Sequence, residues 1–190
     1  MTKNEIRQLY KEKRQNIPSK EKLRLDDLLL LQLQNLHLGD PQFIATYWPL
    51  GKANEPNMHI FNGYCRHAYP QATLCFPVVS GDTMEMMATN ADTVYHTNSF
   101  GIYEPKQGER ISAADIDIVF VPCIVCDMGG NRIGFGKGYY DRFLAHTTHN
   151  TVIIAFQYFE PLVNRIPVND WDIAVDYIIT PTKIFTAQGN

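Results

Sequence analysis

Six short apolar runs, each bounded by turn-forming or polar residues, constrain the fold of this chain more than any other feature. They are "FIATYWP" (43–49), "TLCFPVV" (73–79), "MEMMAT" (84–89), "DIVFVPCIVCD" (117–127), "TVIIAFQ" (151–157) and "DYIIT" (176–180). Their length and composition are typical of β-strands. Helical patterns fall between several of them, at 56–68 and from about 137 to 147. Strands that alternate with helices predict a layered α/β fold, with helices flanking a largely parallel central sheet.

Two helices are expected before the first strand. The stretch "KNEIRQLYKEKRQ" (3–15) has high helix propensity and ends before "NIPSKEK", where Ser19 can cap a second helix over 20–38. That second helix is expected to stop at Gly39 and Pro41. Residues 92–112 predict a long irregular connection, and such connections are often functional. The sequence contains no repeat or linker, so we expect one domain over residues 1–190.

Composition excludes several classes of protein. A hydrophobic fraction of 45% and a charged fraction of 19% are those of a globular chain, and a net charge of −3 gives no basic field for nucleic acid. The amino-terminal residues lack the apolar run of a signal peptide. The apolar stretch 118–126 is too short to span a bilayer. We therefore expect a cytoplasmic protein with neither a nucleic-acid nor a membrane partner. A monomer that binds small molecules is a separate expectation.

The four cysteines do not predict a metal site. Cys123 and Cys126 lie within one expected strand, where positions three apart point to opposite faces and cannot share an ion. Cys65 and Cys75 are ten residues apart, with no second close pair to complete a zinc site. We expect four free, reduced thiols.

The stretch "GGNRIGFGKGYYDR" (129–142) combines five glycines with three cations. It matches neither the phosphate-binding loop nor the dinucleotide fingerprint, because Gly138 follows Lys137 and Tyr139 replaces a required glycine. The remaining G-x-G-x-G pattern at 134–138 runs into a helix whose inner face is expected to comprise Tyr139, Tyr140, Phe143 and Leu144.

Successive backbone amides before a helix can hold an anion, and the nearby cations of Arg132 and Lys137 would add charge. Asp141 could hold a divalent metal beside bound phosphates. The alternative is a glycine-rich loop with solvated cations.

The segment "VPCIVCDMGGNRIGFGKGYYDRFL" closely resembles the signature of the 5-formyltetrahydrofolate cyclo-ligase family, also called methenyltetrahydrofolate synthetases. Four further segments resemble that family in the same order along the chain: "EIRQLYKEKRQ" preceded by Lys3, "YWPLGKANEPN", "FGIYEP" (100–105) and "IPVNDWDIAVDYIIT". One position departs from it, because Phe135 stands where relatives often carry other residues, including a basic one.

The resemblance implies a fold like that of sugar-phosphate isomerases and CoA transferases, and a reaction that uses ATP. ATP phosphorylates the formyl oxygen of 5-formyltetrahydrofolate, nitrogen 10 attacks the activated carbon, and phosphate leaves with formation of 5,10-methenyltetrahydrofolate. The alternative is a catalytically silent paralogue that binds nucleotide or a phosphorylated ligand as a sensor.

The resemblance also implies roles for individual residues. Nucleotide contacts are expected from Lys3, Arg7, Arg132, Ile133, Gly134, Phe135, Gly136, Lys137, Gly138, Tyr139 and Tyr140. Among these, Lys137, Arg132 and Tyr139 are the expected catalytic residues. From the sequence alone, Lys3 and Arg7 could equally be a solvated charge pair, and Tyr140 could simply anchor the helix in the core.

Folate and magnesium contacts follow from the same resemblance. Glu55 is expected to hydrogen-bond the pterin ring, with Trp48 and Tyr139 beside the substrate, although Glu55 could be a solvated loop carboxylate and Trp48 a core residue. Asp141 and Asp172 match the acids associated with Mg²⁺. Nearby Asp170 and Asp176 compete with Asp172 for that assignment.

Overall fold

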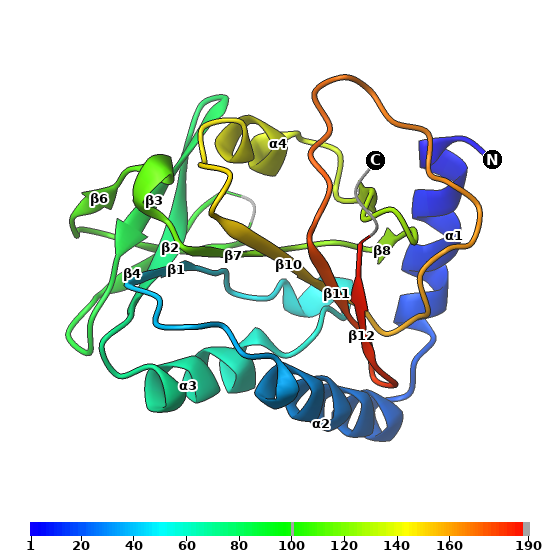
Figure 1. Ribbon diagram of the computed structural model, residues 1–190, viewed down its shortest axis with the longest axis horizontal. Coiled ribbons are helices and arrows are strands. Elements are labelled where there is room, and N and C mark those ends of the chain that lie inside the picture. The colour runs from blue at the N-terminus through cyan, green and yellow to red at the C-terminus, as the bar shows by residue number, and fades with distance from the viewer. Residues whose placement is uncertain (100, 188–190) are drawn as a thin grey trace.

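The computed structural model describes residues 1–99 and 101–187. Within them, the main sheet has eight strands in the order β12-β11-β10-β7-β1-β2-β3-β6 (Figure 1). These strands are β1 Phe43–Ala45, β2 Thr73–Ser80, β3 Thr83–Ala88, β6 Arg110–Ile111, β7 Ile118–Val121, β10 Val152–Phe156, β11 Tyr177–Ile179 and β12 Ile184–Thr186. The central neighbours from β11 to β2 are parallel, and β12, β3 and β6 add antiparallel edges. The expected largely parallel sheet is confirmed.

Strand β7 lies at the centre of this sheet because every one of its side chains is apolar. Ile118 and Phe120 pack into the core on one face, and Val119 and Val121 into the core on the other. A parallel strand covered on both faces requires such a continuous apolar run.

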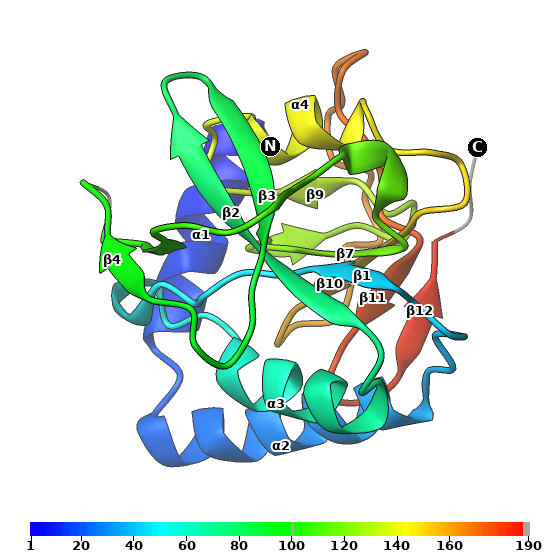
Figure 2. The same cartoon turned by 90° about the vertical axis from the view of Figure 1, so that its left-hand side faces the viewer.

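Helices cover both faces of the sheet. The helices α2 (Ser19–Asn35) and α3 (Met58–Ala68) lie side by side on one face, and the short helix α4 (Tyr139–Leu144) lies on the other (Figure 1; Figure 2). Leu29 and Leu33 of α2 pack with Phe61 of α3 into the first core cluster. Phe143 and Leu144 of α4 pack into the second.

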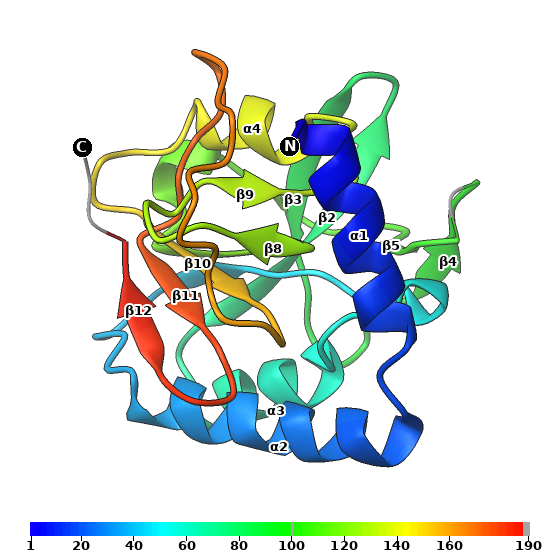
Figure 3. The same cartoon turned by 90° about the vertical axis from the view of Figure 1, so that its right-hand side faces the viewer.

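Helix α1 (Lys3–Gln15) stands apart from these layers, against a small hairpin of β8 (Val125–Cys126) and β9 (Arg132–Ile133) (Figure 3). Ile6 packs there with Val125 and Ile133. The helix begins with a capping box: the Thr2 hydroxyl accepts from the N–H of Glu5, and the Glu5 carboxylate accepts from the N–H of Thr2. This cap fixes the first turn, which carries Lys3. None of the helices in the described part of the chain is long and apolar enough to cross a membrane.

The prediction of a single strand over 117–127 is wrong. The run divides into β7 and β8, separated by Pro122, Cys123 and Ile124. Proline has no N–H to donate to a central ladder, so the chain leaves the main sheet there and pairs with β9 instead.

The cysteine prediction is therefore half right. All four thiols are free and buried, as expected. However, Cys123 and Cys126 pack into the same core cluster, so the two do not point to opposite faces. The neighbouring Cys123 thiol, together with burial, raises the pKa of Cys126 well above its usual range. Strand alternation fails here because Cys123 lies in the break between strands.

Three local predictions also need correction. Residues 92–112 are not irregular throughout, because they contain β4 (Tyr95–Thr97) paired with β5 (Tyr103–Pro105), and β6 on the sheet edge. Ser19 is the first residue of α2 rather than its cap; the cap position is Pro18, without a side-chain hydrogen bond. Helix α2 ends at Asn35, before Gly39. Two short 3₁₀ turns complete the elements, η1 (Gly51–Ala53) and η2 (Ala113–Asp115).

Candidate active site

A cavity of about 540 Å³ opens between the glycine-rich loop, the first turns of α1, the loop after β1, and the β2–β3 hairpin. Its volume is that of a site for a small organic molecule. Every site residue expected from the sequence lines this one cavity: Lys3, Arg7, Trp48, Glu55, Arg132, Ile133, Gly134, Phe135, Gly136, Lys137, Gly138, Tyr139, Tyr140, Asp141 and Asp172. Residues that are 169 positions apart in sequence thus share one chamber.

The glycine-rich loop has the backbone that its sequence predicts. Gly136 and Gly138 have φ of 91° and 71°, the left-handed region that disfavours other residues. A Cβ at Gly136 would meet only the Arg7 guanidinium, at 3.5 Å, so the glycine is required by its backbone angle rather than by space. Arg7 Nε donates to the carbonyl of Gly134 at 2.9 Å, which fixes α1 to the loop.

Helix α4, which follows this loop, has only six residues. Its dipole is correspondingly small, so an anion held here would depend mainly on the loop amides and side-chain cations. Phe143 and Leu144 form the inner face of α4 as expected, whereas Tyr139 does not. The Tyr139 hydroxyl instead donates to the Gly81 carbonyl in the β2–β3 turn at 3.0 Å, and Arg142 lies over its ring.

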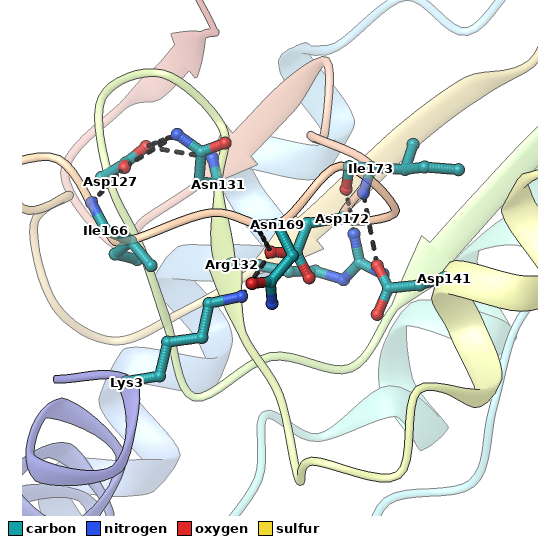
Figure 4. Close-up of polar contacts among 9 residues, drawn as sticks. All are labelled: Lys3, Asp127, Asn131, Arg132, Asp141, Ile166, Asn169, Asp172 and Ile173. Atoms are coloured by element: carbon teal, nitrogen blue, oxygen red, sulfur yellow. Dashed lines mark hydrogen bonds and ion pairs between the residues drawn. The ribbon is translucent and has the colours of Figure 1, made fainter.

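Lys3 and Asp172 form an ion pair between α1 and the segment before β11 (Figure 4). The Asp172 carboxylate also accepts from the N–H of Asn169 at 2.7 Å. Partial burial opposes ionisation, but the hydrogen bonds from Lys3 and Asn169 outweigh it and lower the pKa of Asp172. The competing Asp176 is committed elsewhere, because it accepts from the N–H of Ile153. Neither Asp176 nor Asp170 lines the cavity, which favours Asp172 for the site.

Arg132 and Asp141 form a second ion pair at 2.7 Å, in which the Arg132 side chain is only 6% exposed (Figure 4). Arg132 also donates to the carbonyl of Ile173, and Asp141 accepts from the N–H of the same residue. This closed set joins β9, α4 and the 169–173 segment. These bonds use much of the hydrogen-bonding capacity of the Arg132 guanidinium within the protein itself.

Asp127 is a residue whose importance only the structure reveals. It is buried, and its carboxylate accepts from the N–H groups of Gly129, Asn131 and Ile166 and from the Asn131 amide (Figure 4). These bonds fix the turn that leads into β9 and the glycine-rich loop. The sequence offered one signal of this role, because Asp127 is an acidic residue within the segment 121–144 that resembles the family signature.

Glu55 is a buried carboxylate, 4% exposed, in the wall of the cavity. Its Oε2 accepts from the N–H of Leu50 at 2.6 Å, whereas Oε1 is buried and has no partner among the residues that the structure describes. Burial raises the pKa of Glu55, against the opposing effects of the Leu50 hydrogen bond and the Arg14 charge. A solvated loop carboxylate is therefore excluded, and the unpartnered oxygen fits a ligand donor.

Trp48 and Tyr140 carry two further unpartnered polar atoms into the same wall. The Trp48 ring stacks on Phe76 at 4.5 Å and on His59 at 4.9 Å, so it is packed like a core residue, yet its Nε1 is buried without a partner within residues 1–99 and 101–187. The same holds for the Tyr140 hydroxyl, and burial raises its pKa well above the usual range. The structure therefore supports both alternatives for Trp48 and Tyr140: each packs as a core residue, and each also has a polar atom in the cavity wall for a ligand to bind.

Glu104 and Trp171 are among the cavity residues that escaped the sequence prediction, although both lie in segments that resembled the family. Glu104 is buried and accepts from the N–H of Val79 and from the Asn98 amide. Trp171 is 69% exposed at the cavity, next to Asp172. Phe100, in the same "FGIYEP" segment as Glu104, lies outside the described residues.

The carboxylates of this cavity fit a metal ion only if bound phosphate supplies further ligands. In the described ranges, no group of three or more His, Cys, Asp or Glu side chains is placed to hold an ion. Asp141 uses Oδ1 for Arg132, and Asp172 uses Oδ2 for Lys3, which leaves each carboxylate a second oxygen. One or two carboxylates plus substrate phosphates are the usual ligands of Mg²⁺.

Comparison with known proteins decides the family. The model of the 5-formyltetrahydrofolate cyclo-ligase family matches residues 1–181. The chain belongs to this family.

Relatives within the cyclo-ligase family differ in how much of the chain they match. The chain is 33% identical over 91 residues to the Escherichia coli K12 5-formyltetrahydrofolate cyclo-ligase, a match that covers 46% of this chain and 50% of that protein. The chain thus matches about half the length of this relative. With the Mycoplasma genitalium cyclo-ligase it is 30% identical over 185 residues, covering 93% of this chain and 96% of that protein.

Solved structures of 5,10-methenyltetrahydrofolate synthetases have the same fold. The Aquifex aeolicus protein superposes with a TM-score of 0.84 at 28% identity, covering 100% of this chain and 95% of its own. The Mycoplasma pneumoniae protein gives a TM-score of 0.75 at 25% identity, with 94% and 98% covered.

Proposed function

We propose that this chain catalyses the ATP-dependent cyclisation of 5-formyltetrahydrofolate to 5,10-methenyltetrahydrofolate, with release of ADP and phosphate. One observation carries the proposal. Residues from all five parts of the chain that resemble the cyclo-ligases line a single cavity, which contains both a cationic glycine-rich loop and a buried carboxylate. Phosphate recognition and ring recognition are the two functions that this reaction requires.

In this proposal, the loop amides of 134–138 hold the triphosphate together with Lys3, Arg7 and Lys137. Ile133, Phe135 and Tyr139 complete the wall around the nucleotide. Lys137 is placed in the cavity at the centre of the loop, where its charge stabilises the transferring γ-phosphoryl group.

Arg132 acts through position rather than as a free phosphate ligand. Its bonds to Asp141 and to the Ile173 carbonyl fix the end of the loop and orient the Asp141 carboxylate. Asp141 and Asp172 would hold Mg²⁺ with the phosphates, and the ion would neutralise charge on them.

The pterin binds where polar atoms have no protein partner. In this proposal Glu55 Oε1 accepts from ring N–H groups, and Trp48 Nε1 and the Tyr140 hydroxyl donate to ring acceptors; the support is that all three atoms are buried without a partner among the described residues. A carboxylate that accepts paired donors fixes ring orientation, and here it does so in a largely desolvated wall.

The reaction then needs orientation more than acid–base chemistry. The formyl oxygen attacks the γ-phosphorus and ADP leaves. Nitrogen 10 next attacks the activated formyl carbon, loses its proton, and phosphate departs as the ring closes. Binding ATP and the folate in one cavity converts the first attack from an encounter in solution into a step within a complex, whereas the second attack takes place within the folate molecule and depends on its bound conformation.

The deciding experiment mixes the purified protein with Mg²⁺, ATP and 5-formyltetrahydrofolate. Near-ultraviolet absorbance of the methenyl product should appear, and ADP release should require the folate. If ATP binds but no product forms, the silent-paralogue alternative replaces this proposal. A monomeric state and a cytoplasmic location stay predictions from the sequence.

A further inference from the structure

Residues 54–57 connect the η1 turn to α3 and place Glu55 in the wall of the cavity. At one end of this segment, the Asn54 side chain donates to the Arg14 carbonyl at 2.7 Å. At the other end, the Asn57 side chain accepts from the N–H of His59 and caps α3. The Glu55 backbone lies between these two ends, so its position depends on contacts with other parts of the chain.

A buried pair of side chains supplies those contacts. Asp26 lies on α2 and Tyr158 follows β10, and both are buried. The Tyr158 hydroxyl lies 2.6 Å from Asp26 Oδ1 and 3.1 Å from the carbonyl oxygen of Glu55. Asp26 Oδ1 also accepts from the N–H of Asn57 at 3.0 Å. The pair therefore contacts the backbone on either side of Pro56.

Each oxygen of the Asp26 carboxylate has a donor. Oδ2 accepts from Lys22 Nζ at 2.7 Å, one turn earlier on α2, and this cation balances a charge that would be costly to bury alone. Lys22 Nζ also lies 5.7 Å from the centre of the Tyr158 ring. Burial and the hydrogen bond to Asp26 raise the pKa of Tyr158 well above its usual range, so its hydroxyl keeps the proton that it donates.

Asp26 and Tyr158 lie outside the lining of the catalytic cavity, so they act on a ligand only through another residue. That residue is Glu55, whose Oε1 has no partner among the described residues. Oε2 already accepts from the N–H of Leu50, so the placement of Oε1 depends on where the Glu55 backbone lies. Binding groups must be held close to their productive geometry by the residues behind them.

We propose that Asp26 and Tyr158 are positioning residues for the folate: they fix the Glu55 backbone so that Oε1 meets the N–H groups of the pterin ring. This rests on the proposed function, which takes Glu55 as the acceptor for the pterin. Lys22 balances the charge of Asp26 from the partly exposed side of α2. Loss of these contacts weakens the use of folate and leaves the phosphate loop intact.

Tyr158→Phe tests the proposal because it removes the hydroxyl and keeps the ring in the core. Thr151→Val is the matched control: the Thr151 hydroxyl is also buried and donates to a backbone carbonyl, that of Ile116 at 2.9 Å, outside the cavity. Both variants should have a lower melting temperature. Only Tyr158→Phe should raise the KM for 5-formyltetrahydrofolate, by about fivefold, and its KM for ATP should stay at the parental value.

A double-mutant cycle with Glu55→Gln shows whether Tyr158 acts through Glu55. The quantity compared is kcat/KM for the folate, which is measurable even where the KM is too high to reach. Tyr158→Phe should have little further effect once the Glu55 carboxylate is gone. An equal loss in both backgrounds would overturn the inference, and so would a parental folate KM in the single variant.

Asp26→Asn and Asp26→Ala separate position from charge. An asparagine keeps an oxygen that can accept from Tyr158 and from the N–H of Asn57, and Lys22 is exposed enough to turn toward solvent. Asp26→Asn should therefore keep the folate KM within about twofold of the parent. Asp26→Ala should raise it as Tyr158→Phe does. An equal rise in the KM for ATP would overturn the inference, because it would indicate general damage to the fold.

Calorimetry of 5-formyltetrahydrofolate binding without ATP separates this inference from the proposed function. If the parent forms no methenyl product but binds the folate as tightly as Thr151→Val and more tightly than Tyr158→Phe, only the proposed activity fails. If product forms and all three proteins bind the folate equally well, only the inference fails. A parent that binds no folate overturns both.

Discussion

Arg132 and Asp141 form an ion pair at 2.7 Å in the wall of the cavity, and each also bonds the backbone of Ile173. The side chains are 6% and 24% exposed, so this pair is more shielded than a surface bridge. It sets the relative position of the glycine-rich loop and the segment that carries Asp172. The same carboxylate thus has a structural role beside its proposed role toward Mg²⁺.

Asp141→Asn should therefore have two effects. Leaving the Arg132 charge without its partner should lower the free energy of unfolding by about 1–3 kcal/mol. The proposed loss of a hard anionic ligand should also raise the Mg²⁺ concentration needed for ATP binding. Chemical denaturation without ligand measures the first effect, and ATP calorimetry over a magnesium series the second. The double variant with Arg132→Gln should recover part of the stability but none of the magnesium response; additive losses of stability would deny the coupling.

Glu55→Gln should weaken the use of folate and leave ATP affinity nearly unchanged. An amide cannot accept two N–H donors as the carboxylate does, and truncating a buried charged partner costs about 2–5 kcal/mol of binding. Steady-state kinetics with each substrate varied in turn gives both constants. Glu85→Gln, at an exposed position, serves as the control. Parental values of both constants would remove Glu55 from the site.

Glu55 and Asp172 should give stability opposite dependences on pH. Because the folded pKa of Glu55 is raised above about 4.5, folding favours its protonated form, and this contribution is lost as pH rises from the ordinary value through the raised one. The pKa of Asp172 is lowered from 3.8, so its contribution is present above that value and is lost as pH falls through the folded pKa.

Unfolding free energies of the parent, Glu55→Gln and Asp172→Asn between about pH 3 and 7 test this. The stability gained by Glu55→Gln relative to the parent should grow with rising pH, and the loss in Asp172→Asn should shrink as pH falls. Parallel curves for all three proteins would contradict the two shifts.

Gly136→Ala should strain the loop, because φ at this position is 91°. The expected cost in stability is about 1–3 kcal/mol. Gly39→Ala is a matched control with φ of 69°, open space around it and no place in the cavity. Both variants should lose similar stability by thermal melting, but only Gly136→Ala should weaken ATP binding by calorimetry. Unchanged ATP affinity in Gly136→Ala would show that the glycines form a turn with no role in nucleotide binding.

Lys137→Ala should weaken ATP binding in a normally shaped loop. The substitution removes one charge and spares the backbone amides, and the residue is exposed at the cavity. Its melting temperature should stay close to that of the parent, in contrast to Gly136→Ala. Lys106→Gln, an exposed lysine outside the cavity, controls for net charge. Equal ATP affinity in Lys137→Ala and the parent would exclude its role at the phosphates.

Local sequence is enough to predict the parallel sheet and the set of candidate site residues. Continuous apolar strands such as 118–121 have no stable solution except burial on both faces, so a layered parallel sheet followed from local composition. The backbone of Gly136 and Gly138 was predictable for a similar reason, since glycine adopts positive φ at little cost. Motif resemblance then named residues that all line one cavity.

The partners of those residues follow from the packing of the elements against one another, which no local pattern predicts. Lys3 meets Asp172 across 169 positions, and Arg132 meets Asp141 through two elements that no local pattern brings together. Three further features also depend on packing between elements. They are the stacking of Trp48 on Phe76, the contact between Cys126 and Cys123, and the Arg14 donors that have no partner among the described residues. Propensity and periodicity report the environment of a residue along its own element, whereas ion pairs and unpartnered atoms depend on distances between elements, which packing alone sets.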